Sequence, residues 1–275
     1  MLRLGANIRL MGPQARPEIV TACARAAEAA GLDDLWVPDH VAIPPDDAEG
    51  SNGIYLDALA SLAYLAACTE HIGLGTAALV LPYRPALPTA KLVASVQELS
   101  AGRLQLGVGV GWMDAEFRAL GVDRGARGRI TDETLAFLNA CFSAPDDVVV
   151  ANGQPFLFRP RPPRPPIFIG GAARFAHPRV LEHGDGWMPI GLEPEALAPE
   201  VERLRADAAA VGRPAPEIVW LGAISLRDPA AAADRIAALA EAGATRVVWA
   251  RRYADADEFQ RGVEAFARAA RRGLA

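Results

Sequence analysis

The stretch LSAGRLQLGVGVGW, residues 99–112, contains the end of one element, a whole second element and the turn that follows it. Ala101 and Gly102 are typical of a helix end, because glycine readily adopts the left-handed conformation found there. The apolar run at 104–108 predicts a buried strand, and a helical pattern resumes at Asp114. The order helix, strand, glycine-rich turn, helix is that of one unit of an α/β protein.

The same alternation extends outward from this stretch in both directions. Further strands are expected at 2–8, 34–38, 72–76 with an extension to 81, 167–169, 186–190, 217–224 and 246–250. Helices are expected at 17–30, 55–68, 88–99, 114–120, 130–142, 175–183, 194–211, 229–242 and 255–271. Strands joined by helical crossovers should be parallel. Eight such units in about 250 residues predict an α/β protein with a (β/α)8 barrel, the TIM barrel, and a doubly wound sheet is the alternative.

The alternation is interrupted between residues 144 and 166. The segments 148–150 and 155–158 predict a small hairpin around an Asn152–Gly153 turn. The proline-rich segment 159–166 is too constrained for a helix and should be an extended connector. No internal boundary has the polar, flexible composition of a linker. We therefore expect a single domain over residues 1–275, with a short insertion at about 144–166 after the fourth βα unit.

Composition excludes several classes of protein. The chain has 275 residues, of which 51% are apolar and 22% charged, and this is enough for a well-buried core. A net charge of -5 argues against bulk nucleic-acid binding. The longest apolar run, 58–68, is far shorter than the roughly 18 residues of a membrane-spanning helix, and the N-terminus lacks the apolar region of a secretory signal. With the widely spaced Cys23, Cys68 and Cys141, these features predict a cytoplasmic protein without disulfides.

In a (β/α)8 barrel the active site lies at the C-terminal ends of the strands, so the residues after each apolar run are candidates. They are Asn7, Asp39 with His40, and the segments 77–80, 109–112 and 170–174. Asp39 and His40 are the best candidates for proton chemistry, because histidine titrates near neutrality and a neighbouring carboxylate can orient it. The alternative is an aspartate that caps a turn beside a half-buried histidine.

Two glycine-rich turns could approach a ligand. The turn at 107–111 lacks the third glycine of the dinucleotide-binding fingerprint, because position 112 is Trp; it either lets the backbone approach a ligand or is only a tight turn. Gly170 and Gly171 lie between a strand and a helix, where free N–H groups and the helix dipole suit a phosphate. Arg174 can add charge-assisted bonds, although such glycine pairs are often only turns.

Metal and nucleophile chemistry have little support. No His-x-His pair, carboxylate cluster, Gly-x-Ser-x-Gly elbow or Walker A loop is present, so no metal site is expected. Among the tryptophans, Trp36, Trp220 and Trp249 are expected to pack in or beside strands. Trp112 and Trp187 follow strand ends and could contact a flat ligand.

Several of these stretches together resemble the bacterial luciferase-like monooxygenase superfamily. They are 35–40, 72–76 with 81–82 and 84–85, 99–112 with 116–117 and 120–121, 167–171 and 184–187. Their order agrees with the superfamily and they cover nearly the whole chain. Within it, the sequence looks most like the group of F420-dependent oxidoreductases.

This resemblance implies that a flavin or the deazaflavin F420 lies across the strand ends. Asp39 would contact the deazaflavin and His40 would donate a proton. A cis non-proline peptide behind the ring would correspond to Ala77–Ala78. Further cofactor contacts would come from Val80, Val110, Gly111 and Ala115, with Gly170, Gly171, Ala173 and Arg174 at the phosphate. Substrate contacts would come from Asn7, Trp112 and Trp187.

One departure from the family pattern narrows the range of expected substrates. F420-dependent sugar-phosphate dehydrogenases have a catalytic glutamate where this chain has Trp112, which argues against glucose 6-phosphate and favours an apolar or planar substrate. We therefore expect an F420-dependent oxidoreductase that transfers a hydride between the deazaflavin and a small organic molecule. The alternatives are an FMN-dependent monooxygenase and a cofactor-binding protein without catalysis, against which His40 argues. The resemblance also implies a homodimer, whereas the net charge and the short apolar runs predict no nucleic-acid or membrane partner.

Overall fold

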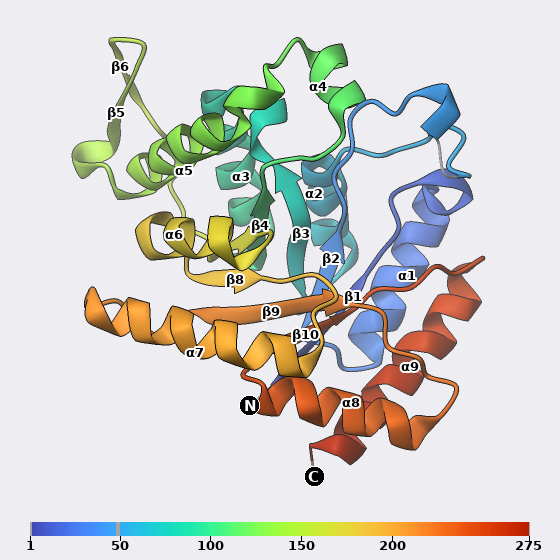
Figure 1. Ribbon diagram of the computed structural model, residues 1–275. Helices are drawn as coiled ribbons and strands as arrows, with labels where there is room; N and C mark the ends of the chain where they lie inside the picture. The colour runs from blue at the N-terminus through green and yellow to red at the C-terminus, as the bar shows by residue number, and fades with distance from the viewer. Residues whose placement is uncertain (1, 48–49, 275) are drawn as a thin grey trace.

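A computed structural model describes residues 2–47 and 50–274 and contains a closed parallel barrel of eight strands surrounded by helices (Figure 1). The strand order is β1-β10-β9-β8-β7-β4-β3-β2, and β1 pairs with both β2 and β10, which closes the barrel. The strands are β1 (Arg3–Asn7), β2 (Asp34–Val37), β3 (Gly73–Val80), β4 (Leu104–Gly109), β7 (Ile167–Gly170), β8 (Gly186–Met188), β9 (Glu217–Gly222) and β10 (Arg246–Trp249). The predicted TIM barrel is confirmed, and the doubly wound sheet is excluded.

The helices follow the expected order and differ from the expectation mainly at their ends. They are α1 (Pro17–Ala29), α2 (Ala58–Cys68), α3 (Ala86–Leu99), α4 (Asp114–Leu120), α5 (Arg127–Ser143), α6 (Ala173–His183), α7 (Pro194–Ala210), α8 (Pro229–Glu241) and α9 (Ala256–Gly273). The helix expected at 55–68 begins at Ala58, because the Asp57 carboxylate accepts the Ala60 N–H at 2.9 Å and caps it. None of the helices in the described ranges is both long and apolar enough to cross a membrane.

The interruption in the pattern is a hairpin that projects from the barrel (Figure 1). Strands β5 (Val148–Ala151) and β6 (Gln154–Leu157) pair antiparallel. Asn152 and Gly153 have φ angles of 49° and 76°, as expected for a two-residue hairpin turn with positive φ at both positions. Phe158 anchors the base of the hairpin, since it is buried and its ring lies edge-on to Phe142.

The barrel interior is filled, and this confines any ligand to the rim. Trp36, Phe168 and Met188 belong to a cluster of apolar side chains inside the strands. A Cβ on Gly75 would lie 2.3 Å from the Trp36 ring, so the neighbouring strand needs glycine where the indole packs. At the N-terminal end of the barrel, the buried Asp34 forms an ion pair with Arg246 at 2.7 Å, and these two charged side chains close the interior. The C-terminal ends of the strands are therefore the open end of the fold.

Candidate active site

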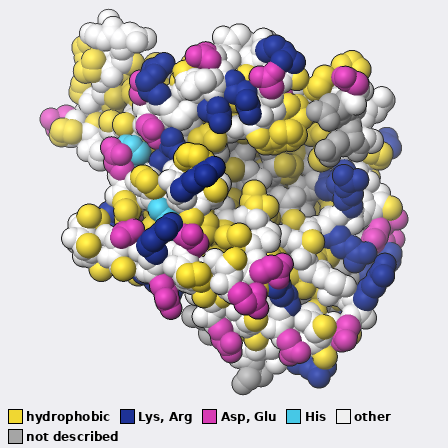
Figure 2. Space-filling model, in the orientation of Figure 1, with side chains coloured by type: hydrophobic (Ala, Val, Ile, Leu, Met, Phe, Trp, Pro, Cys, Tyr) yellow, Lys and Arg dark blue, Asp and Glu magenta, His cyan; other side chains and the backbone are white. Residues whose placement is uncertain are grey.

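The C-terminal ends of β3, β4 and β7 form a floor of small residues. A Cβ added to Gly109 would lie 3.4 Å from the Ala78 Cβ, and one added to Gly170 would lie 3.7 Å from it. The Ala77–Ala78 peptide is cis, as predicted. Figure 2 shows that the middle of this face of the molecule is hollow and has hydrophobic side chains along its upper edge. The three adjacent strand ends thus leave room for a flat group to lie against the backbone.

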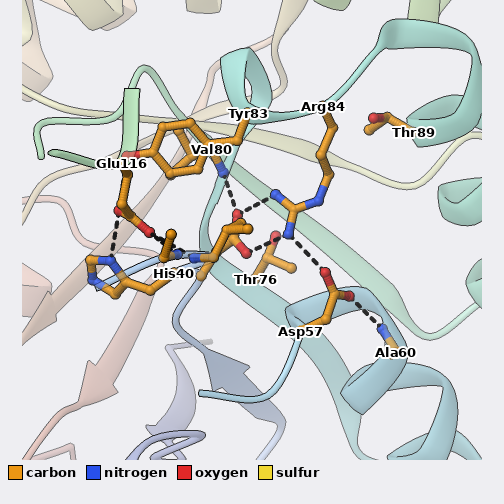
Figure 3. A network of polar contacts seen from close by, with 12 residues as sticks. His40, Asp57, Ala60, Thr76, Val80, Tyr83, Arg84, Thr89 and Glu116 are labelled. Carbon is orange, nitrogen blue, oxygen red and sulfur yellow. Dashed lines mark hydrogen bonds and ion pairs between the residues drawn. The ribbon is translucent and has the colours of Figure 1, made fainter. Parts of the chain in front are cut away.

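His40 follows β2 and lies between a buried carboxylate and two aromatic rings. Its Nδ1 is 3.0 Å from Oε2 of Glu116, which belongs to α4 (Figure 3). The rings of Tyr55 and Trp112 lie edge-on to the imidazole, with centroids 5.2 Å and 6.2 Å away. Because a carboxylate can only accept, Nδ1 must carry the proton of the neutral ring. None of the described residues forms a hydrogen bond with Nε2, which leaves that nitrogen for a ligand.

Glu116 is completely buried and accepts four hydrogen bonds. Besides His40, the donors are the N–H groups of Val41 at 2.6 Å and Ala42 at 3.0 Å and the hydroxyl of Tyr83 at 2.9 Å. Burial alone would raise the pKa of Glu116, but the hydrogen bonds from His40 and the two N–H groups outweigh it and lower the pKa. Burial and the Glu116 carboxylate raise the pKa of Tyr83, so its hydroxyl stays a neutral donor. Glu116 is therefore a carboxylate that fixes both the loop after β2 and the His40 ring.

Asp39 is the centre of a second network on the other side of the same loop. Its carboxylate accepts hydrogen bonds from both Nη atoms of Arg84, each at 2.7 Å, and from the Val80 N–H at 2.9 Å (Figure 3). Arg84 also bonds Asp57, the cap of α2, at 2.8 Å. Burial would lower the pKa of Arg84, but the two carboxylates outweigh it and raise the pKa. The Asp39 side chain is 0% exposed, so it acts on the site by holding the end of β3. Its contact with a cofactor stays a prediction.

The turn between β7 and α6 is open, as a phosphate site requires. Gly171 has a φ of 116°, and a Cβ added there would meet no atom within 4 Å. Ala172 precedes α6 without a side-chain cap, so the first N–H groups of the helix have no side-chain acceptor, and Ala173 is only partly buried. Arg174 is exposed, and its guanidinium lies 4.5 Å from the Phe175 ring centroid. These groups fit a phosphate, although their role stays a prediction.

The other predicted residues occupy different environments. Trp187 is 0% exposed and donates its indole N–H to the Gly171 carbonyl at 2.8 Å. It lines a pocket together with Gly171 and Ala172, and its contact with a substrate stays a prediction. Trp112 is 62% exposed beside His40. Gly111 needs glycine, because its φ is 77° and a Cβ would lie 2.8 Å from Val80. Val110, Ala115 and Asn7 are partly buried, and Asn7 ends β1 without a side-chain hydrogen bond to any described residue.

Three residues of these two networks were not singled out from the sequence as site candidates: Tyr83, Arg84 and Glu116. Glu116 was noted only within the family pattern, because in a helix of seven residues its position does not distinguish it from the exposed Asp114. The neighbouring buried residue Phe117 gives no signal either, because consecutive positions of a helix face different directions. Within the described ranges, no group of three or more His, Cys, Asp or Glu side chains is placed to hold a metal ion.

Replacing Glu116 with glutamine is expected to reduce the amount of unfolding free energy that the protein loses at acid pH. Because the pKa of Glu116 is lower in the folded than in the unfolded chain, its carboxylate stabilises the fold at neutral pH, and this contribution is lost as the pH falls below about 4. The difference in unfolding free energy between the parent protein and Glu116→Gln should therefore shrink on acidification. Urea unfolding over a pH series measures it. Glu133→Gln, at an exposed glutamate on α5, should show no such trend; an equal Glu116→Gln difference at every pH would contradict this explanation.

The comparisons with known proteins agree with the barrel fold. Residues 4–273 match the family described as luciferase-like monooxygenase. An uncharacterized protein of Mycobacterium tuberculosis (strain ATCC 25618 / H37Rv) is 30% identical over 265 residues, 90% of this chain and 92% of that protein. The FMNH2-dependent dimethylsulfone monooxygenase of Pseudomonas putida is 32% identical over 159 residues, 54% of this chain and 43% of that enzyme. An F420-dependent secondary alcohol dehydrogenase has the same fold, with a TM-score of 0.76 and 18% identity over 96% of this chain and 99% of that one. The chain belongs to the luciferase-like monooxygenase family, whose members are oxidoreductases and monooxygenases.

Proposed function

We propose that this protein is an F420-dependent oxidoreductase that transfers a hydride between the deazaflavin and a small apolar or planar organic substrate, with His40 as the proton donor. The observation that carries the proposal is the 3.0 Å contact between His40 Nδ1 and the buried Glu116 carboxylate beside a floor of small residues. The resemblance to the F420-dependent group, and the fold shared with an F420-dependent dehydrogenase, support this cofactor.

The residues present suit a flat cofactor with a phosphate. Ala77, Ala78 and Gly109 would lie under the ring, because none has a side chain larger than a methyl group. The N–H groups at the start of α6 and the Arg174 guanidinium would hold the phosphate. When bound, the cofactor supplies the hydride chemistry, and the protein supplies orientation and electrostatics.

Glu116 prepares His40 for proton transfer. The carboxylate accepts a hydrogen bond from Nδ1–H and so leaves Nε2 to give or take a proton at the barrel mouth. The complete burial of Glu116 prevents water from replacing the histidine as its partner. Tyr55 and Trp112 restrict the imidazole from two further directions, and the exposed Trp112 ring offers an apolar surface to a substrate.

The protein is expected to bind F420 more tightly than FMN. Fluorescence titration with each cofactor at the same salt concentration measures the two dissociation constants. Gly171→Val, in which a branched side chain would enter the open turn, should weaken the binding of both cofactors if their phosphates share this site. Tighter binding of FMN would overturn the choice of cofactor.

The alternative is an FMN-dependent monooxygenase, which the similarity to an FMNH2-dependent enzyme over about half of the chain supports. The two functions differ in their reaction with oxygen, because reduced FMN reacts with it readily and reduced F420 largely does not. Oxygen consumption by the protein with each reduced cofactor therefore distinguishes them. Rapid consumption with reduced FMN, coupled to oxygenation of a substrate, would favour the monooxygenase.

A further inference from the structure

A pocket of about 210 Å³ lies at the rim of the barrel, between the loops that follow β9 and β10 and the first turns of α9. Four arginines line it, Arg227, Arg251, Arg252 and Arg261, together with a single carboxylate, Glu258. Figure 2 shows Lys and Arg side chains gathered along the right-hand edge of the molecule, where α9 begins in Figure 1. This positive charge is local, since the whole chain has a net charge of -5.

Three of the four arginines of this pocket differ from most other arginines in having no partner among the residues that the structure describes. Within residues 2–47 and 50–274, Arg227, Arg251 and Arg261 form no ion pair and no hydrogen bond, whereas Arg84, for example, is held by two carboxylates. Arg252 has an interaction of its own and is not counted among these three. Like charges brought together repel each other, so the free pocket carries an unfavourable electrostatic energy that an anion would relieve.

The neighbouring carboxylates accept hydrogen bonds from backbone N–H groups. Asp228 accepts the Ala230 N–H at 2.9 Å and caps α8. Asp255 caps α9 by accepting the Glu258 N–H at 2.8 Å, and the Glu258 carboxylate accepts the Ala254 N–H at 2.8 Å. None of the three forms an ion pair with Arg227, Arg251 or Arg261. Both α8 and α9 begin at this rim, so the positive ends of two helix dipoles add to the charge of the guanidinium groups.

The frame that carries these arginines is fixed. The buried Tyr253 hydroxyl accepts the Arg9 N–H at 2.9 Å, and the Ala254 carbonyl accepts the Gln14 amide at 3.0 Å, so the loop after β10 is tied to the loop after β1. A Cβ on Gly262 would lie 2.3 Å from the Trp249 ring, which places that indole directly against α9. The pocket is therefore built on packed residues, although its arginine side chains reach into solvent.

We propose that this pocket binds a multiply charged phosphate group, a phosphate ester or a pyrophosphate. Guanidinium groups match phosphate oxygens in pairs, which makes arginine well suited to this anion. The volume is several times the roughly 30 Å³ that one water molecule takes in the liquid, so it has room for more than a single small ion. In chain order β9 and β10 are the seventh and eighth barrel strands, and the loops after these strands often bind phosphate in TIM barrels. The proposal is independent of the function proposed above.

Calorimetric titration of the purified protein with pyrophosphate tests the site. Arg251→Gln and Arg261→Gln should each weaken binding by about 10-fold or more, the loss expected for one charge-assisted hydrogen bond. Arg129→Gln, at an exposed arginine paired with Glu133 on α5, is the matched control and should leave binding unchanged. Inorganic phosphate should bind more weakly than pyrophosphate, and both should bind more weakly at higher salt.

Thermal unfolding gives a second measurement on the same variants. Without an anion, Arg251→Gln and Arg261→Gln should unfold at the same or a higher temperature than the parent protein, because they reduce repulsion in the pocket. Pyrophosphate should raise the unfolding temperature of the parent protein more than that of the variants.

Three results would overturn the proposal. The first is the absence of saturable pyrophosphate binding, and the second is binding that neither pocket variant weakens. Binding at the turn after β7 is one form of the second result, and it would be weakened by Arg174→Gln while the pocket variants would leave it unchanged. Equally tight binding of citrate would assign the pocket to carboxylates and would overturn the choice of phosphate.

Discussion

Replacing His40 with alanine is expected to lower turnover by roughly 100-fold to 10,000-fold, the usual contribution of a general acid or base. The imidazole is held by the buried Glu116 carboxylate at 3.0 Å and is the titratable group that we place beside the reacting atoms. Cofactor affinity should change little, because the phosphate turn around Gly170 and Gly171 would provide much of that binding. Stopped-flow measurement of cofactor reduction, with equilibrium binding on the same samples, separates the two effects.

Two further variants test whether the loss of turnover is specific to the His40 imidazole and its carboxylate partner. His71→Ala is the control, since this histidine is 86% exposed and its alanine variant should have normal turnover. Glu116→Gln keeps the shape of the partner but removes its charge, so it should lower turnover less than His40→Ala and shift the pH profile. Near-normal turnover of His40→Ala would mean that this histidine is only structural. The proton would then come from water or substrate, because Trp112 occupies the position of the glutamate in the sugar-phosphate dehydrogenases.

Replacing Arg84 with methionine is expected to lower the free energy of unfolding by about 3–5 kcal/mol, the range for removing one partner of a buried ion pair. Asp39 is 0% exposed and would keep only the Val80 N–H as a donor among its present partners. Asp57 would also lose the guanidinium that joins it to Asp39. Urea unfolding measures the change. Arg129→Met, at an exposed pair, should cost at most about 1 kcal/mol, and a loss this small for Arg84→Met would contradict the interpretation.

A variant of the other residue in this ion pair, Asp39→Ala, distinguishes an effect on stability from an effect on cofactor binding. Asp39→Ala leaves Arg84 with Asp57 and should therefore destabilise the fold less than Arg84→Met. It should still weaken cofactor binding, because Asp39 holds the Val80 N–H at the end of β3, and the family resemblance places its carboxylate at the ring. Normal cofactor affinity in Asp39→Ala would leave this residue with a structural role only.

The barrel was predictable because its signals are local. Each strand is a short apolar run, each helix has its own periodicity, and turns such as Asn152–Gly153 require positive φ at both positions. The Ala77–Ala78 cis peptide was predictable only from the family resemblance. The sequence shows two small residues at these positions, but it does not show that the peptide bond between them is cis. The homodimer expected from the same resemblance stays a prediction.

The sequence by itself determined the order of strands and helices, the inserted hairpin and the strand ends on which Asp39, His40 and Gly170 lie. Only the tertiary structure decided the partners of these residues. Glu116 follows His40 by 76 residues, Arg84 follows Asp39 by 45, and the indole of Trp187 lies under Gly171 from the next strand. Such contacts depend on closure of the barrel and on the register between strands. Periodicity records only which face of an element is buried, so it does not reveal which buried carboxylate meets which donor.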